Sequence, residues 1–323
     1  MSPAGQEIKR KLSMKDVLLW SHGEPPPPGP RHIGIHTSTA GGVELAAERA
    51  YRLGANTFQI FSSSPRQWKP YSLAQTQCDA MRRLREKYKL APMVIHTSYL
   101  VNLASATPEF HRKSVAAFRG ELQRALALGA DYLVLHPGSF RGRIREEGLK
   151  LVAHSIAEAA QGLKLEKSSL KVLIENTAGA EFSLGGSFEQ VARLLEYLRP
   201  VCPAGACIDT CHTHVSGYDI VSESGWQETM RQLDSTTGLK NVHVWHCNDA
   251  RDARGSKRDR HQHIGKGTIG LESFRRLLND PRTEHAAFIA ETPIDDPGDD
   301  LRNVETLKSL VTITGSKAKR KRA

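Results

Sequence analysis

The chain has 323 residues and a net charge of +10, with 39% hydrophobic and 25% charged residues. This composition is typical of a soluble globular protein, and no run of about 18 apolar residues predicts a membrane span. Five cysteines without a C-x-x-C pair argue against both a secreted disulfide framework and a zinc ribbon.

The positive charge is concentrated at the two ends of the chain. Residues 315–323 hold five Lys/Arg and no acid, and residues 1–31 hold five Lys/Arg and three acids, so that residues 32–314 carry only +3. A basic tail favours a nucleic-acid partner or a nuclear import signal, whereas a solvated, disordered tail explains it equally well. We expect nuclear localisation, with the mitochondrion and the cytoplasm as alternatives.

The first 31 residues end in the proline run Pro25 to Pro30, which cannot form a helix and predicts a stiff, extended spacer. We therefore expect residues 1–31 to be a disordered, proline-rich extension, and the folded domain to span residues 32–314.

From His32 onward, short apolar runs alternate with polar loops and with stretches of helical periodicity such as Val43 to Leu53 and Phe118 to Leu128. We count eight predicted strands, which end near His36, Phe61, His96, His136, Glu175, Asp209, His246 and Glu291. The seven steps average about 36 residues, which predicts a single (β/α)₈ TIM barrel.

Six of the eight runs close on a potential metal ligand: His96, His136, Glu175, Asp209, His246 and Glu291. His212 follows Asp209 by one helical turn. In a TIM barrel the carboxyl ends of the strands meet at one face, so these side chains would converge, and mixed His and carboxylate groups suit a metal. A single strand end of this kind is explained by a hydrogen-bonded core histidine or by a carboxylate paired with a buried arginine, but six of them are not.

A long polar loop is predicted from Asn248 to Gly267, and loops of this length in a compact domain are usually functional. It offers two further ligands, Asp259 and His261, and phosphate contacts from Arg251, Arg254, Lys257, Arg258 and Arg260.

Several neighbours of these residues have more than one interpretation. His214, His243 and His263 compete with His212, His246 and His261 as ligands, although alternation along the predicted strand VHVWH places His246 with Val242 and Val244, opposite His243. We interpret Cys207, Cys211 and Cys247 as small buried residues and His36 as a core residue or a lining residue of the site. Asn102, Asn176 and Asn248 either orient ligands and loops or form turns.

The motifs at the strand ends resemble those of the endonuclease IV family of apurinic/apyrimidinic (AP) endonucleases, from about His32 to Thr314. The motifs are HTSYLVNLAS from His96, LHPGS around His136, IENTAG around Glu175, CIDTCHTHVSGYD from Cys207, HCNDA from His246, DRHQHIGKG from Asp259 and ETP from Glu291.

The resemblance implies a TIM barrel with three zinc ions that cuts duplex DNA on the 5′ side of an abasic site and also trims blocked 3′ ends. The first zinc would be held by His96, His136 and Glu175. The second would be held by Glu175, Asp209, His246 and Glu291, and the third by His212, Asp259 and His261. Glu175 and Glu291 are the residues expected to act in catalysis.

By the same resemblance, Arg66, Tyr99 and Leu100 would enter the base stack at the lesion, and Arg260 would contact the DNA. We expect a monomer without membrane contact. Two alternatives remain at this point: a metal-dependent sugar isomerase or epimerase on a related barrel, and a non-catalytic protein that binds DNA through its tail and loop.

Overall fold

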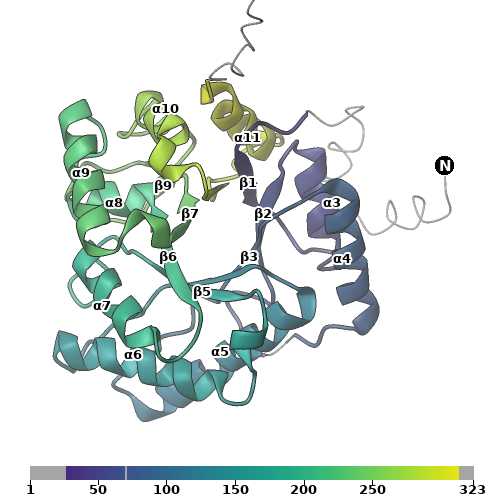
Figure 1. The fold of residues 1–323 in the computed structure, drawn as a ribbon, viewed down its shortest axis with the longest axis vertical. Coiled ribbons are helices and arrows are strands. Elements are labelled where there is room, and N and C mark those ends of the chain that lie inside the picture. The colour runs from purple at the N-terminus through teal and green to yellow at the C-terminus, as the bar shows by residue number, and fades with distance from the viewer. Residues whose placement is uncertain (1–26, 70, 313–323) are drawn as a thin grey trace, which may run out of the picture.

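The computed structural model describes residues 27–69 and 71–312 (Figure 1). Most of the predicted N-terminal extension, residues 1–26, and the whole basic tail, residues 315–323, lie outside the described residues.

Eight parallel strands close into a barrel in the order β1-β10-β7-β6-β5-β4-β3-β2. The predicted TIM barrel is therefore confirmed, and each strand ends at the predicted residue or one residue before it. The strands are β1 (His32–His36), β2 (Thr57–Phe61), β3 (Met93–His96), β4 (Tyr132–Leu135), β5 (Lys171–Glu175), β6 (Ala204–Asp209), β7 (Val242–His246) and β10 (Ala287–Ala290).

Helices surround the barrel (Figure 1). They are α3 (Leu45–Arg52), α4 (Gln75–Tyr88), α5 (Pro108–Leu128), α6 (Arg145–Ala160), α7 (Phe188–Leu198), α8 (Thr210–Ser216), α9 (Glu223–Thr236), α10 (Leu271–Asn279) and α11 (Asp299–Leu310), with 3₁₀ turns η1 (Leu165–Lys167), η2 (Leu239–Asn241) and η3 (Pro281–Thr283). Helix α5 includes the predicted segment from Phe118 and begins ten residues earlier, because Pro108 occupies its first turn, where the fixed φ of proline favours a helix start. Among the described helices, none combines the length and the apolar character needed to cross a membrane.

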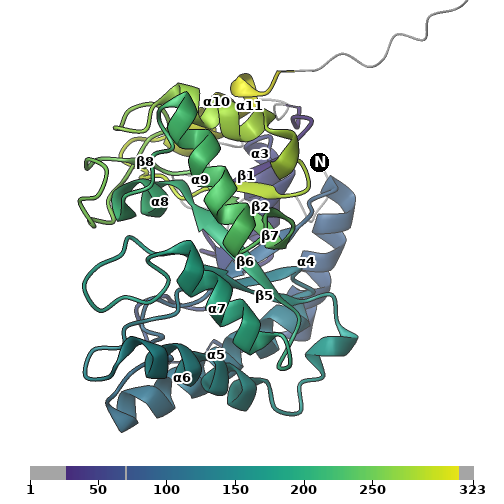
Figure 2. The ribbon, with the colours of Figure 1, turned by 60° about the vertical axis from the view of Figure 1, so that its left-hand side comes forward.

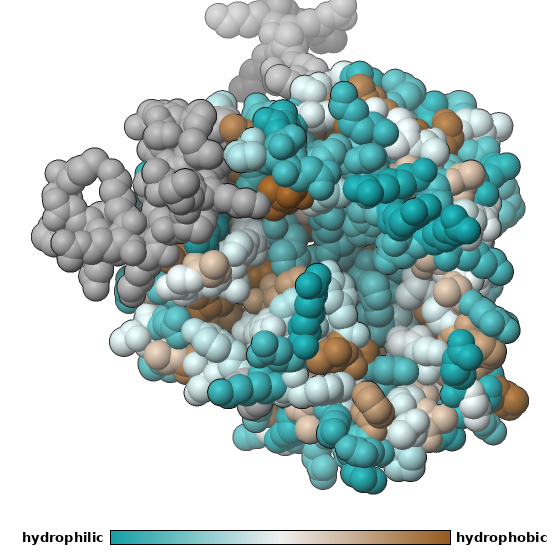
Figure 3. All heavy atoms as spheres, turned by 180° about the vertical axis from the view of Figure 1, so that it is seen from behind, coloured by the Kyte–Doolittle hydropathy of each residue, from teal (hydrophilic) through white to brown (hydrophobic). Residues whose placement is uncertain are grey.

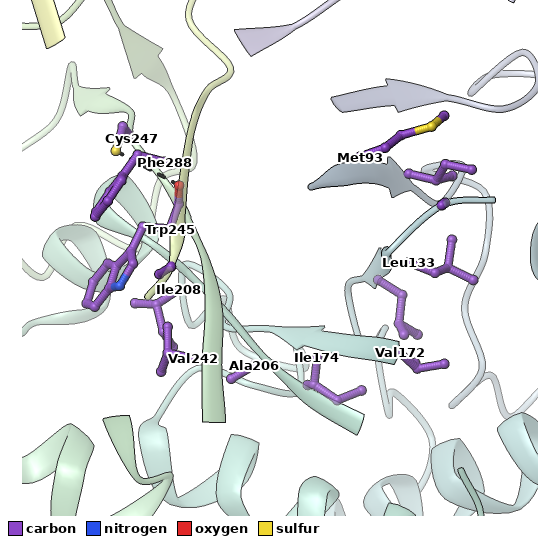
Figure 4. Close-up of a cluster of buried hydrophobic side chains, with 14 of the residues drawn as sticks. Met93, Leu133, Val172, Ile174, Ala206, Ile208, Val242, Trp245, Cys247 and Phe288 are labelled. Carbon is purple, nitrogen blue, oxygen red and sulfur yellow. Dashed lines mark hydrogen bonds between the residues drawn. The ribbon is translucent and has the colours of Figure 1, made fainter. Parts of the chain in front are cut away.

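The interior of the barrel is filled by six apolar side chains, one from each of six strands: Val94, Val134, Leu173, Cys207, Val244 and Ile289. Each of them lies two residues before one of the six polar strand ends. Because residues i and i+2 of a strand share a face, the six polar side chains also point into the barrel, above this apolar layer. The alternate residues point outward and pack against the helices, as Figure 4 shows for Ile174, Ala206, Ile208 and Trp245.

Strand β7 departs from this alternation. Its register with β6 shifts between the pairs Ala206–Val242 and Cys207–Val244, so that one extra residue, His243, lies between Val242 and Val244. Val242 therefore packs in the outer core together with Ala206 (Figure 4), while Val244 lies in the interior. The prediction that Val242 shares the face of His246 was wrong, because a bulge interrupts the period of two.

Gly34 of β1 is required by the close approach of strand β2. It pairs with Thr57, and a Cβ atom at position 34 would lie 1.9 Å from the carbonyl oxygen of Thr57. We expect Gly34→Ala to destabilise the protein by about 3 kcal/mol or more, because the clash is with backbone that cannot move without distorting the barrel. Thermal unfolding should show a fall in Tm of at least about 5 °C.

Gly29→Ala is the matched control, because a Cβ atom there would meet only Lys308 Cγ at 3.5 Å, an ordinary contact. A Gly34→Ala protein that unfolds at the temperature of the wild type would contradict this account of the barrel packing.

Candidate metal centre

The polar side chains gather at the end of the barrel where the strands terminate and the long loops project. These loops, including the one that carries β8 (Asp249–Ala250), extend to one side in Figure 2. That side faces the viewer in Figure 3, where the middle of the surface is hollowed and lined by hydrophilic residues.

Glu175 lies at the centre of the site. Its side chain has no exposed surface, and its Oε2 atom lies 3.0 Å from Nε2 of both His96 and His136. Its Oε1 atom lies 2.9 Å from Nδ1 of His246. Two groups of possible ligand atoms therefore share this carboxylate: His96, His136 and Glu175 form one, and Glu175, Asp209, His246 and Glu291 form the other.

A third group lies beside them and consists of His212, Asp259 and His261. The two oxygens of Asp259 lie 3.1 Å from Nε2 of His212 and 3.1 Å from Nε2 of His261. Both ring nitrogens are buried, and neither has a hydrogen-bond partner of good geometry. Orphaned nitrogens that converge with a carboxylate are the arrangement that a bound cation would satisfy.

Backbone carbonyl groups fix the orientation of three of the histidine rings. Each ring directs Nδ1 to a carbonyl oxygen and leaves Nε2 facing the site: His96 to Thr97 at 2.8 Å, His212 to Asn176 at 2.8 Å, and His261 to Glu291 at 3.1 Å. Metal-binding histidines are commonly held by such a contact on the nitrogen that does not bind the metal.

The electrostatics of the site also favour a cation. Burial by itself raises the pKa of the Glu175 carboxyl, yet His246 and His136 outweigh it and hold that pKa well below its usual range. Burial lowers the pKa of His212, but Asp209 and Asp259 raise it well above the ordinary value. Ionised carboxylates in a dry site require positive partners, which protons on the rings or metal ions can supply.

Three comparisons with known proteins bear on this geometry. A family model described as a xylose isomerase-like TIM barrel matches residues 47–310. A probable endonuclease 4 from Solibacter usitatus (strain Ellin6076) is 50% identical over 280 residues, which cover 86% of this chain and 96% of that protein. The crystal structure of endonuclease IV from Thermus thermophilus has a TM-score of 0.78 at 38% identity, covering 87% of this chain and 98% of that one.

The chain belongs to the endonuclease IV family. It is therefore a metal-dependent hydrolase that cleaves DNA in DNA repair. A D-tagatose 3-epimerase-like protein has a TM-score of 0.62 at 19% identity, which shows that the fold is shared and carries nothing further toward the sugar-epimerase alternative.

Gln59 of β2 is a polar residue of this endonuclease IV site that the sequence analysis missed. Its Nε2 donates to Oε1 of Glu291 at 2.6 Å, and its Oε1 lies 2.9 Å from Nε2 of His246. His36 also contacts Gln59, at 3.1 Å, and belongs to none of the three groups. The signal in the sequence was a glutamine in the middle of the apolar run TFQIF, on the inward face of the strand.

Two asparagines hold residues that carry carboxylates of the site, so the turn interpretation does not suffice for them. Asn248 donates to Oδ2 of Asp209 at 2.5 Å and accepts from the backbone N–H of Glu291 at 2.7 Å. Asn176 accepts from the backbone N–H of Asp209 at 2.7 Å. Asn102 instead holds loops together: its Oδ1 accepts from the backbone N–H of Ser139 at 3.0 Å.

The competing histidines lie outside the three groups. His243 stacks on Tyr132, with ring centroids 5.3 Å apart, near the amino end of β7. His214 contacts Thr268 at 3.2 Å, and His263 contacts Asn303 at 3.0 Å.

The cysteines near the site are buried, as predicted. Cys207 and Cys211 lie close enough to other ligand atoms to complete two further groups, Glu175–Cys207–His246 and Asp209–Cys211–His261. Burial raises the pKa of the Cys207 thiol to about 12 and also raises that of Cys211. Because a thiolate is the form that binds a metal, these raised pKa values favour the His and carboxylate groups.

The loop after β7 is closed at its base. Its ends pair as the short antiparallel strands β8 and β9 (His261–Gln262), which the sequence analysis did not predict. The buried carboxylate of Asp249 accepts hydrogen bonds from the backbone N–H groups of Gly265 and Ile269, both at 2.9 Å. This closure places Asp259 and His261 over the barrel.

The predicted DNA contacts differ in their surroundings. Tyr99 is 64% exposed, and its ring lies 6.3 Å from that of His96, so it stands at the rim of the metal centre. Arg66 is exposed in the loop that follows β2, and Leu100 follows Tyr99 in the loop after β3. Arg260, by contrast, makes two hydrogen bonds to Asp252, at 2.7 and 2.5 Å, which already engage its guanidinium group.

We expect Gln59→Leu to weaken metal binding by about 10- to 100-fold, because it removes the hydrogen bonds that Gln59 makes with His246 and Glu291. Titration of the metal-free protein with zinc, followed by calorimetry, measures this change.

Gln75→Leu is a suitable control, because Gln75 is exposed on α4 and bonds only to Asp79 of its own helix. Unchanged zinc affinity in the Gln59→Leu protein would show that this glutamine does not orient the ligands.

Proposed function

We propose that the chain binds three zinc ions and hydrolyses the phosphodiester on the 5′ side of abasic sites in duplex DNA, leaving a 3′-hydroxyl and a 5′-deoxyribose phosphate. The observation that carries this proposal is the convergence of three groups of His and carboxylate ligands, two of which share the buried carboxylate of Glu175.

The proposed zinc ligands are the nine residues of these groups: His96, His136, Glu175, Asp209, His212, His246, Asp259, His261 and Glu291. Zinc is favoured over magnesium or calcium because five of the nine ligands are imidazoles, whereas hard cations select oxygen. Bound zinc supplies two things that phosphodiester hydrolysis needs: it neutralises phosphate charge, and it lowers the pKa of water.

Glu175 and Glu291 have different tasks in this proposal. Glu175 has no exposed surface, is held by three imidazoles, and belongs to two of the groups, so its task is to join them. The side chain of Glu291 is 17% exposed, and Gln59 fixes one of its oxygens. Its other oxygen lies 3.2 Å from Nδ1 of His246, within the second group of ligand atoms, where it would hold a zinc ion that lowers the pKa of the attacking water.

Recognition of an abasic nucleotide cannot use a base edge, because no base is present. Flipping such a nucleotide out of the stack costs only a few kcal/mol, and side chains must then fill the gap. Arg66, Tyr99 and Leu100 are the proposed filling residues, since they lie on two neighbouring loops at the rim of the metal centre. The same hydrolysis would remove blocking groups from 3′ ends. We propose that the protein acts as a monomer.

Incision of an oligonucleotide duplex that carries one abasic site tests the function, with zinc determined on the same protein sample. We expect cleavage 5′ to the site, about three zinc ions per chain, and loss of activity on chelation that zinc restores. An intact duplex of the same sequence should not be cut.

Glu291→Gln should lower the incision rate by about 100-fold or more, because several kcal/mol of transition-state stabilisation depend on this site. Glu305→Gln, a change at an exposed carboxylate of α11, should leave the rate unchanged. Full zinc occupancy without incision by the wild type would refute the proposed activity.

We also propose nuclear localisation through the five basic residues of segment 315–323. A fluorescent reporter fused to these nine residues should concentrate in the nucleus, and the same fusion with the five basic residues changed to alanine should not. A diffuse distribution of the unaltered fusion would contradict this assignment.

A further inference from the structure

Helix α5 carries a buried ion pair that no step of the hydrolysis uses. Glu121 is 2% exposed and Arg124 is 8% exposed, and their side chains lie 3.1 Å apart. Neither belongs to a metal group. Both face the loop that follows β2, residues Ser62 to Lys69, which we name the β2 loop and which contains Arg66.

The ion pair is bound to the start of the β2 loop by a closed set of hydrogen bonds. Ser62 donates its hydroxyl hydrogen to Glu121 Oε2 and accepts from Nε of Arg124 at 2.7 Å. Ser63 donates to Glu121 Oε1 at 3.3 Å and accepts from Nη2 of Arg124 at 3.3 Å. Each hydroxyl therefore has one donor and one acceptor partner.

The same helix also holds the loop that carries Tyr99 and Leu100. The hydroxyl of Ser114 accepts from the backbone N–H of Asn102 at 3.0 Å. Ser98 joins the two loops directly, because its hydroxyl donates to the carbonyl oxygen of Pro65 at 2.8 Å. Arg66 and Tyr99 are thus placed relative to one another both by this direct bond and by the contacts of the two loops with α5.

The β2 loop packs on α5 through one aromatic contact, between Trp68 and Phe110, whose ring centroids lie 6.3 Å apart. A cavity of about 290 Å³ separates the outer part of the loop from α5 and is lined by Gln67, Trp68 and Lys69 on one side and by Gly120 on the other. Because this cavity leaves the outer part of the loop without close packing along most of α5, the polar contacts at the base contribute to the position of Arg66.

The free energy of folding alone explains this ion pair poorly, because buried ion pairs seldom improve it over apolar residues. Burying two charges costs desolvation free energy, and apolar residues of similar size are often as stabilising or more so. The charged groups instead fix the orientation of the loop, because the carboxylate and the guanidinium each hold two serine hydroxyl groups at defined angles.

We propose that Glu121 and Arg124 are positioning residues for DNA recognition, which fix the β2 loop so that Arg66 stands beside Tyr99 at the rim of the metal centre. This inference rests on the proposed function in one respect, namely that Arg66 contacts DNA at the lesion.

The test is Glu121→Gln, which keeps the shape of the side chain and removes its charge. KM for an abasic duplex should rise about tenfold or more while kcat and zinc content stay within about twofold, because binding changes and the metal groups do not. Amide hydrogen exchange of residues 62–69 should become faster in the protein without DNA.

A double mutant identifies the route of the effect. If Glu121 acts through Arg66, the Arg66→Ala/Glu121→Gln protein should have nearly the same KM as Arg66→Ala alone. Additive increases in KM would overturn the proposal.

Asp131→Asn is the matched control. It breaks another ion pair between elements of the barrel, Arg85–Asp131 at 2.6 Å. The carboxylate of Asp131 also accepts a hydrogen bond from the backbone N–H of Met93, at the end of β3 that lies away from the site. It should lower Tm and leave KM unchanged. If Glu121→Gln likewise lowers Tm without changing KM or the exchange of residues 62–69, the ion pair is structural and the proposal is wrong.

The exchange measurement separates this inference from the proposed function. If the wild type does not cut abasic DNA but exchange of residues 62–69 accelerates in the Glu121→Gln protein, the activity assignment fails while the positioning of the loop stands. If exchange is unchanged, the positioning role fails whatever the protein cuts.

Discussion

A carboxylate without exposed surface can stay ionised only where positive groups surround it, and this constraint governs the site around Glu175. Three imidazoles, from β3, β7 and the end of β4, lie within about 3 Å of its two oxygens. The ring of His96 is held in turn by a backbone carbonyl and that of His246 by Gln59. Asn248 holds the carboxylate of Asp209, and Asn176 holds its backbone. The upper half of the barrel is thus one connected polar network that is complete only with cations.

The apolar layer beneath this network makes the arrangement possible. Six apolar side chains fill the barrel, each two residues before one of the six polar strand ends. Because residues i and i+2 of a strand point to the same face, the same strands fill the core and direct the ligands into the site. The floor of the metal centre is buried and apolar, which strengthens the electrostatic interactions above it. The core and the site are therefore two consecutive layers of the same strands.

The fold was largely predictable because each unit repeats the same local pattern. Strand ends such as His96 and Glu175 were located to within one residue, since apolar runs of four to six residues leave little freedom. The bulge at His243 was not predictable, because it arises from pairing with β6 and no local feature of VHVWH signals it. The same holds for the pairing of β8 with β9, which joins Ala250 to His261 across the long loop.

The candidate site was predictable where a ligand ends a strand and was not where a residue acts through another residue. Gln59 and Asn248 contact carboxylates from strands far away in sequence, and amides of this kind also occur in ordinary turns. Arg260 stays a predicted DNA contact, and what the sequence did not predict is its pairing with Asp252, which engages two of its three guanidinium nitrogens. Pairwise geometry of this kind is not contained in a pattern of residue types.

The closure of the long loop at Asp249 has a consequence for the ligands that the loop carries. The buried carboxylate of Asp249 and the two short strands join the two ends of the loop. These contacts offset the entropic cost of closing the loop. The tip of the loop is fastened a second time, because the backbone N–H groups of Gly255 and Lys257 donate to the carbonyl oxygens of His214 and Val215 on helix α8, at 3.2 and 2.9 Å. Asp259 and His261 therefore lie on a segment that is anchored on both sides, so a change in loop length would shift the third group of ligands relative to the barrel.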